Sequence, residues 1–246
     1  MVSFQETVAI GSLAAIPPLL IGILLGYLPR GRWKWTRLPV FTTIAAGIIT
    51  WFFLDVMSEA AFLGVNQGFS GGPAHLLIVL LFPLGLFTMI ALDQWPRPNA
   101  MADPAYLAAL AVGFHGIAEG VLIGSGFAPA TDILGAIGGI EAGESFVAHK
   151  ILEGFAIGVL LNLQGDYSRT VKTALLAGLP TVLGLGIGYI LSPDSSFFFA
   201  LGAGPALWLL ARLLQQSSSL TNKTVWAISL LAGVLLMYTA GLLHTG

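Results

Sequence analysis

Long apolar runs alternate with short polar connections along the whole chain. A membrane-spanning helix needs roughly 20 predominantly apolar residues. Eight runs meet this requirement, at about 6–28, 39–64, 73–93, 104–127, 132–163, 171–191, 196–214 and 224–244. The first run lacks a basic leading region, so we interpret it as a retained helix rather than a cleaved signal peptide. We therefore predict an all-α integral membrane protein with eight transmembrane helices in a single domain, residues 1–246.

Composition supports a membrane protein and narrows the chemistry. The mean hydropathy is +0.88, and only 9% of the residues are charged, against about 25% in soluble domains. The chain has no cysteine, which excludes disulfides and thiolate metal sites and leaves His, Asp and Glu as the strong metal ligands. A net charge of −2 argues against a large basic surface for nucleic acid. We expect the lipid bilayer to surround the protein.

Basic residues fall almost entirely in alternate loops of this eight-helix arrangement. Nine of the ten occupy the first, third, fifth and seventh connections or their edges: Arg30, Arg32, Lys34, Arg37, Arg97, Arg169, Lys172, Arg212 and Lys223. The second, fourth and sixth connections contain none. Because cytoplasmic loops carry the Lys/Arg excess, we predict that both termini lie outside the cell membrane. The short loops favour a prokaryotic inner membrane.

Charged residues also lie inside the predicted helices. They are Asp55, Glu59, Glu119, Glu141, Glu144, Lys150 and Glu153. Each charge at the bilayer centre costs at least about 2.5–3.5 kcal/mol on insertion scales. A single intramembrane Glu is often only a structural hydrogen-bonding group, but seven charges on three helices indicate a pathway or a set of mutual partners.

Two of these helices carry the same motif, H-x-x-x-E-G. It reads H-G-I-A-E-G at 115–120 and H-K-I-L-E-G at 149–154. Residues i and i+4 share one helix face, so each helix presents one imidazole and one carboxylate together. If the helices pack side by side, His115, Glu119, His149 and Glu153 converge, and imidazole with carboxylate is a ligand set suited to Zn²⁺. The glycine after each Glu favours close approach of a neighbouring helix.

The remaining carboxylates are expected to form an entrance to this site. Asp55, Glu59, Glu141 and Glu144 fall in the outer halves of their helices under the predicted orientation. Clustered carboxylates raise the local concentration of cations. His75, near the outer start of the third helix, can add a ligand there, although a lone His in that position is more often an interfacial side chain.

With its motifs and topology together, the chain resembles the ZIP family of divalent metal transporters. Those proteins carry an H-N-x-P-E-G type motif on helix 4 and H-x-x-P-E-G or H-E-x-P-H-E on helix 5, and often H-L-L-P-E-A on helix 2, where this chain reads D-V-M-S-E-A at 55–60. The resemblance covers the whole chain in topology and is most specific in helices 4 and 5. It implies a 3+2+3 arrangement with an inverted repeat, a mid-membrane transport site at His115, Glu119, His149 and Glu153, and inward flux.

The departures from the family pattern predict one metal rather than two. Family members that hold a second metal bind it through the residue after each His and a Glu before a Pro on helix 6. Those positions are Gly116, Lys150 and Leu179 here, and none of the three is a good metal ligand. The ammonium of Lys150 can stand in for the charge of the second cation, or form a salt bridge to a carboxylate of helix 2 or helix 5. These two roles are compatible.

The leading interpretation is therefore a transporter of divalent transition-metal cations. Zn²⁺ is favoured, Fe²⁺, Mn²⁺, Co²⁺ and Cd²⁺ are alternatives, and no cofactor beyond the transported metal is expected. In this interpretation a four-helix unit moves against the rest to alternate access. An intramembrane zinc-dependent hydrolase is the alternative, although the chain has no H-E-x-x-H motif. A permease for a polar organic solute is a third. The sequence leaves the coupling ion and the oligomeric state open, a homodimer included.

Overall fold

The computed structural model describes residues 2–27, 38–67, 73–95, 104–164 and 167–242, and the side chains in these ranges apart from residues 62–67 and 167. Within these ranges the chain is helical and contains no strand. The helices are α1 (Phe4–Tyr27), α2 (Leu38–Gln67), α3 (Pro73–Gln94), α4 (Pro104–Phe127), α5 (Ile133–Ala136), α6 (Ile140–Gln164), α7 (Thr170–Leu191), α8 (Ser196–Ser217) and α9 (Lys223–Leu242), with the short 3-10 turn η3 (Tyr167–Arg169) before α7.

Eight of these helices are long and apolar enough to cross a membrane. Their bounds agree with the eight predicted segments to within about three residues, except in the fifth. The end of the predicted eighth segment, residues 243 and 244, lies outside the described residues.

The prediction of one long fifth helix over 132–163 is wrong. Asp132 accepts a hydrogen bond from the backbone N–H of Gly135 at 2.8 Å and begins the single-turn helix α5. The chain then bends at Gly138 and Gly139, whose φ values of 80° and 100° lie in the region that favours glycine. The spanning helix α6 begins only at Ile140, so Glu141 belongs to its first turn.

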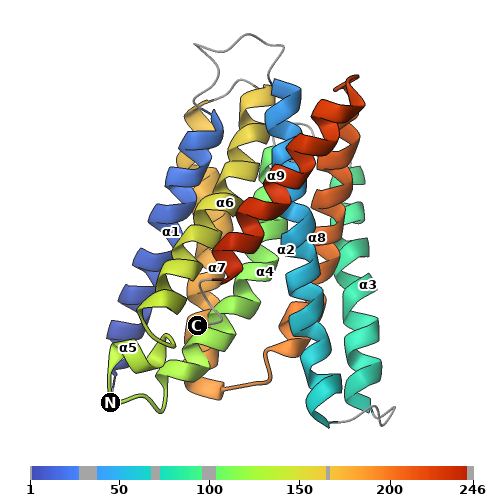
Figure 1. The fold of residues 1–246 in the computed structure, drawn as a ribbon. Coiled ribbons are helices and arrows are strands. Elements are labelled where there is room, and N and C mark those ends of the chain that lie inside the picture. The colour runs from blue at the N-terminus through green and yellow to red at the C-terminus, as the bar shows by residue number, and fades with distance from the viewer. Residues whose placement is uncertain (1, 28–37, 68–72, 96–103, 165–166, 243–246) are drawn as a thin grey trace.

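The helices run as a bundle in which α4 and α6 occupy the middle (Figure 1). Helix α4 packs mainly against α7 and also against α8, while α6 packs mainly against α1. Helix α2 lies against α8 and α9, and α3 lies against α8. Both helices with the H-x-x-x-E-G motif are therefore held from more than one side. Their buried faces meet in the middle of the bundle.

Glycines bring the central helices unusually close to their neighbours. A Cβ atom at Gly154 or Gly158 of α6 would collide with the carbonyl oxygen of Leu19 or Ile23 on α1. On α4, a Cβ at Gly120 would collide in the same way with the carbonyl oxygen of Thr181 on α7. Small residues permit this backbone contact between membrane helices. The glycine after each Glu thus sets the distance to α1 or α7, which carry none of the predicted ligands, whereas the sequence suggested that it brings a neighbouring helix within ligand distance.

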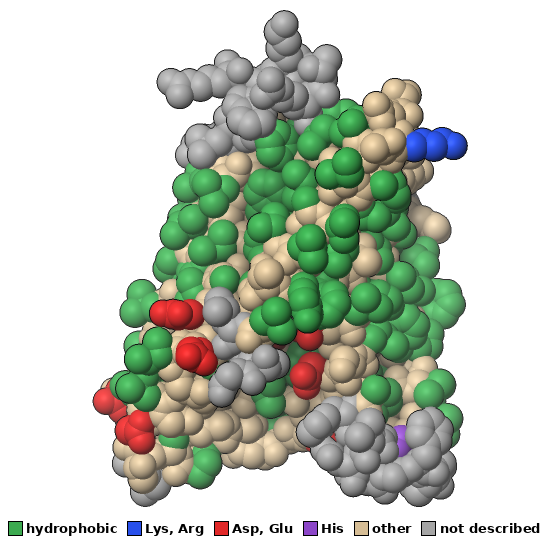
Figure 2. All heavy atoms as spheres, in the orientation of Figure 1, with side chains coloured by type: hydrophobic (Ala, Val, Ile, Leu, Met, Phe, Trp, Pro, Cys, Tyr) green, Lys and Arg blue, Asp and Glu red, His purple; other side chains and the backbone are tan. Residues whose placement is uncertain are grey.

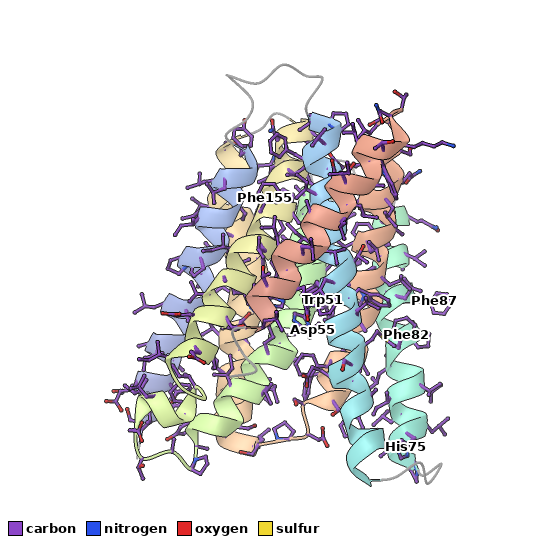
Figure 3. All side chains as sticks on the ribbon, in the orientation of Figure 1. Trp51, Asp55, His75, Phe82, Phe87 and Phe155 are labelled. Carbon is purple, nitrogen blue, oxygen red and sulfur yellow. The ribbon has the colours of Figure 1, made fainter. Side chains whose placement is uncertain are left out.

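The outer surface of the bundle is apolar. Exposed large side chains include Leu80 and Phe87 on α3, Leu183 and Ile190 on α7, and Ile228 on α9. Hydrophobic side chains cover the middle of the face shown in Figure 2, and Phe87 points away from the bundle in Figure 3. An apolar surface of this extent is typical of contact with lipid, in agreement with a multi-pass membrane protein.

The α1–α6 contact can be tested at Gly158. We expect Gly158→Ala to lower the free energy of unfolding by about 1–3 kcal/mol, since overpacking a rigid contact has this cost. The measurement is thermal unfolding of the purified protein in detergent. Gly186→Ala on α7 is the matched control, because its Cβ would meet only side-chain atoms of Phe4, 3.8 Å away. Equal stability of the two variants would contradict the proposed role of close packing at Gly158.

Candidate metal site

A group of three potential metal ligands lies buried between α4 and α6. One ligand atom from each of His115, Glu119 and Glu153 lies within 4.8 Å of the other two. His115 is 3% exposed and Glu153 is fully buried. The i, i+4 spacing on α4 places His115 Nε2 3.3 Å from Glu119 Oε1. Two helices that are distant in sequence thus supply one compact set of nitrogen and oxygen donors.

His149 lies beside this group rather than within it. Its Nε2 atom is 3.8 Å from Glu153 Oε1, but His149 does not belong to the set of mutually close ligand atoms found among the described residues. The ring of Phe52 on α2 lies near both imidazoles, with centroid distances of 4.4 Å to His115 and 5.9 Å to His149. His149 therefore places a second imidazole next to the three ligands but not among them.

Lys150 occupies the other side of the two carboxylates. Its Nζ contacts Glu119 Oε2 and donates a hydrogen bond to Glu153 Oε2 at 2.8 Å. The side chain is fully buried, and its ammonium lies 5.4 Å from the ring centroid of Phe146. The predicted salt bridge was to a carboxylate of the second or the fifth predicted helix. It is present as Lys150–Glu153 within α6, whereas the second partner, Glu119 on α4, was not predicted.

The cluster of Glu119, Glu153 and Lys150 has an excess of negative charge. Two carboxylates and one ammonium carry a net charge of −1 when all are ionised. Burying charges is expensive unless they are paired, and Lys150 pairs with only one oxygen of each carboxylate. Glu153 Oε1 is buried with no hydrogen-bond partner among the described residues. Together with His115 Nε2, which lies 3.3 Å from Glu119 Oε1, this oxygen fits a bound cation with mixed nitrogen and oxygen ligands.

Aromatic side chains wall the site and were not predicted from the sequence. Phe52 meets the His115 ring edge to face at an interplanar angle of 77°. Phe199 on α8 lies on another side of the same imidazole, with 5.5 Å between ring centroids. Packing of this kind restricts the orientation of the ligand. Aromatic residues are common throughout this chain, so nothing in the sequence singled these two out.

The predicted entrance carboxylates are not part of the central group. Asp55 and Glu59 on α2 and Glu141 and Glu144 on α6 are all exposed. All four lie toward the end of the bundle at which α1 begins, and acidic side chains gather in that half of the face in Figure 2. Asp55 lies on α2 one turn beyond Trp51 (Figure 3). Their role as an entrance for cations stays a prediction.

The predicted His75 and the polar residue Ser145 both lie outside the ligand group. His75 lies at the beginning of α3, at the lower end of the bundle in Figure 3, and is not part of the described ligand group. Ser145, which lies one turn before His149 on α6, donates a hydrogen bond to the carbonyl oxygen of Ala240 at 2.8 Å. Ser145 therefore fastens α6 to α9.

Comparison with known proteins adds no family assignment: no protein-family model matches the chain, and no curated protein matches its sequence significantly.

We expect the purified protein to bind one divalent transition-metal ion per chain. Glu119→Gln and Glu153→Gln should each weaken binding by more than the roughly 10–100-fold cost of changes outside the ligand shell. Isothermal titration with Zn²⁺ or Co²⁺ measures both stoichiometry and affinity. Glu6→Gln, which alters an exposed carboxylate on α1, is the control. Unchanged affinity in both site variants would place the metal elsewhere.

Proposed function

We propose that this protein carries divalent transition-metal cations across the membrane in the manner of ZIP-type transporters. The ligands are His115, Glu119, His149 and Glu153, and Zn²⁺ is the favoured cargo. The observation that supports this most directly is the buried group of His115, Glu119 and Glu153 inside a bundle of eight apolar helices. The repeated H-x-x-x-E-G motif adds His149 from the sequence.

The helix contacts suggest which parts would move. Helix α6 packs against α1 and α4 against α7 through the glycines described above, and α1 also packs against α7. Helices α2, α3, α8 and α9 form a second set, which meets the first mainly where α8 packs against α4. All four ligands belong to the first set. In the proposed mechanism the first set moves against the second and exposes the ligands to each side in turn. Flux is inward if the resemblance to the family extends to direction.

The 3+2+3 arrangement with an inverted repeat is also part of the proposal. An inverted repeat would pair α1 with α7, α2 with α8, α3 with α9 and α4 with α6. When each helix is replaced by its pair, every major helix contact becomes another major contact or stays the same. The contact of α1 with α6 becomes that of α7 with α4, and the contact of α2 with α9 becomes that of α8 with α3. Helices α1 and α7 run in opposite directions through the bundle (Figure 1), as an inverted repeat requires.

The two alternative functions make different demands on the site. A catalytic zinc keeps an open position for water and needs a general base, yet both carboxylates of the cluster are already engaged by Lys150. A permease for an organic solute would be indifferent to EDTA. Metal flux that chelation abolishes therefore favours the transporter over both.

The decisive measurement is metal flux in proteoliposomes. Vesicles containing a zinc indicator should show uptake of external Zn²⁺ with wild-type protein, and Glu119→Ala and His149→Ala should each abolish it by removing a ligand. Glu6→Ala should transport normally, because its carboxylate is exposed and outside the cluster. Lack of Zn²⁺, Fe²⁺, Mn²⁺ and Cd²⁺ uptake by well-folded wild-type protein would refute the proposed function.

The proposed orientation can be tested separately, because the native chain has no cysteine. Single cysteines at Thr131 and Ser219, both exposed, lie in connections predicted to face opposite sides. We expect a membrane-impermeant maleimide added to intact cells to label Thr131→Cys and to leave Ser219→Cys unlabelled until the cells are lysed. The reverse pattern would invert the proposed topology without changing the fold.

A further inference from the structure

The two halves of the cluster, one from the motif on α4 and one from the motif on α6, differ at one polar position. The motifs of α4 and α6 match at His, at Glu and at the following glycine, but Gly116 of α4 corresponds to Lys150 of α6. A side chain at Gly116 would collide with the hydroxyl of Thr181 on α7, so α4 has no space for an equivalent lysine. The cluster therefore contains a single ammonium, which one half contributes.

That ammonium divides the carboxylate oxygens into two sets. Lys150 Nζ binds the Oε2 atoms of both Glu119 and Glu153. The Oε1 atoms point to the other side, 3.3 Å from His115 Nε2 and 3.8 Å from His149 Nε2. Each carboxylate can thus offer only one oxygen to an ion on the imidazole side. With both imidazoles, the two carboxylates and two histidines of the described cluster supply at most four donor atoms there.

Cations differ in how well they tolerate this limit. Zn²⁺ is commonly four-coordinate with nitrogen and oxygen ligands. Ca²⁺ takes about 6–8 oxygen ligands and often binds both oxygens of a carboxylate. Mg²⁺ requires an octahedral set of oxygens and gives up its water reluctantly. Because two carboxylate oxygens are not available as ligands, the affinity for Ca²⁺ and Mg²⁺ falls more than the affinity for a transition metal that also accepts imidazole nitrogen.

We propose that Lys150 is a specificity-determining residue that excludes Ca²⁺ and Mg²⁺ by holding one oxygen of each site carboxylate. This inference rests on the proposed transport function, because it concerns the same site. The ammonium acts in a second way that favours the same result. It lowers the negative charge of the metal-free cluster, on which hard cations bound only through oxygen depend most.

Competition binding tests the role of Lys150. Co²⁺ is bound to wild-type protein, Lys150→Met and Lys150→Gln, and Ca²⁺ or Mg²⁺ is added as competitor. Both variants free the Oε2 atoms of an ammonium partner, so Ca²⁺ should displace Co²⁺ at least about tenfold more effectively than in wild type, as expected when ligand charge and number increase. Lys150→Arg keeps a cation and should retain wild-type selectivity. Unchanged selectivity in folded Lys150→Met and Lys150→Gln would overturn the proposal.

A second measurement requires no variant and covers the case in which loss of Lys150 prevents folding. Co²⁺ in a four-coordinate site absorbs visible light far more strongly than in a six-coordinate site. We expect the intense spectrum from wild-type protein. A weak six-coordinate spectrum, together with normal Zn²⁺ flux, would overturn the role of Lys150 and leave the transport function intact. Absence of both Co²⁺ binding and Zn²⁺ flux would refute the transport function itself.

Discussion

Burial of Glu119 and Glu153 beside Lys150 is the constraint on which the rest of the site depends. Two carboxylates that meet between apolar helices repel each other, and neither can recover the hydration that it has lost. Lys150 compensates part of this cost by contacting both. It leaves one oxygen of each carboxylate directed at an imidazole. In the proposed function, the excess of negative charge that makes the cluster costly to bury is also what attracts a cation.

The packing of the bundle brings the charged groups of α4 and α6 together. Glycines on α4 and α6 let α7 and α1 approach backbone to backbone, which fixes the rear faces of both motif helices. Because close helix contacts in lipid depend on packing rather than on the hydrophobic effect, small residues are needed where the position of a neighbouring helix must be held firmly. Phe52 on α2 and Phe199 on α8 pack against the ring of His115. The backbone contacts with α1 and α7 and the aromatic contacts to His115 together restrict where the ligands can lie.

Much of the fold and part of the site could be predicted from the sequence, for physical reasons. The bilayer sets the length of each helix, so apolar runs gave the eight spans, and i, i+4 spacing paired His115 with Glu119 and His149 with Glu153. Hydropathy cannot detect the break at Gly138 and Gly139, since glycine is also common inside membrane helices. Nor does spacing along one helix reveal a partner on another, and for this reason the contact of Lys150 with Glu119 was missed.

The difference between Gly116 and Lys150 has an electrostatic consequence that an entirely symmetric cluster would lack. With a lysine in both halves, two ammonium groups would neutralise both carboxylates, and a divalent ion would enter a cluster without net charge. With none, the two carboxylates would be buried without an internal partner, a large desolvation cost. One ammonium lies between these extremes, because the net charge passes from −1 without metal to +1 with a divalent ion. Neither state departs far from neutrality, and in the proposed transport cycle this limits the electrostatic cost of moving the site, with or without metal, within the low-dielectric interior of the protein.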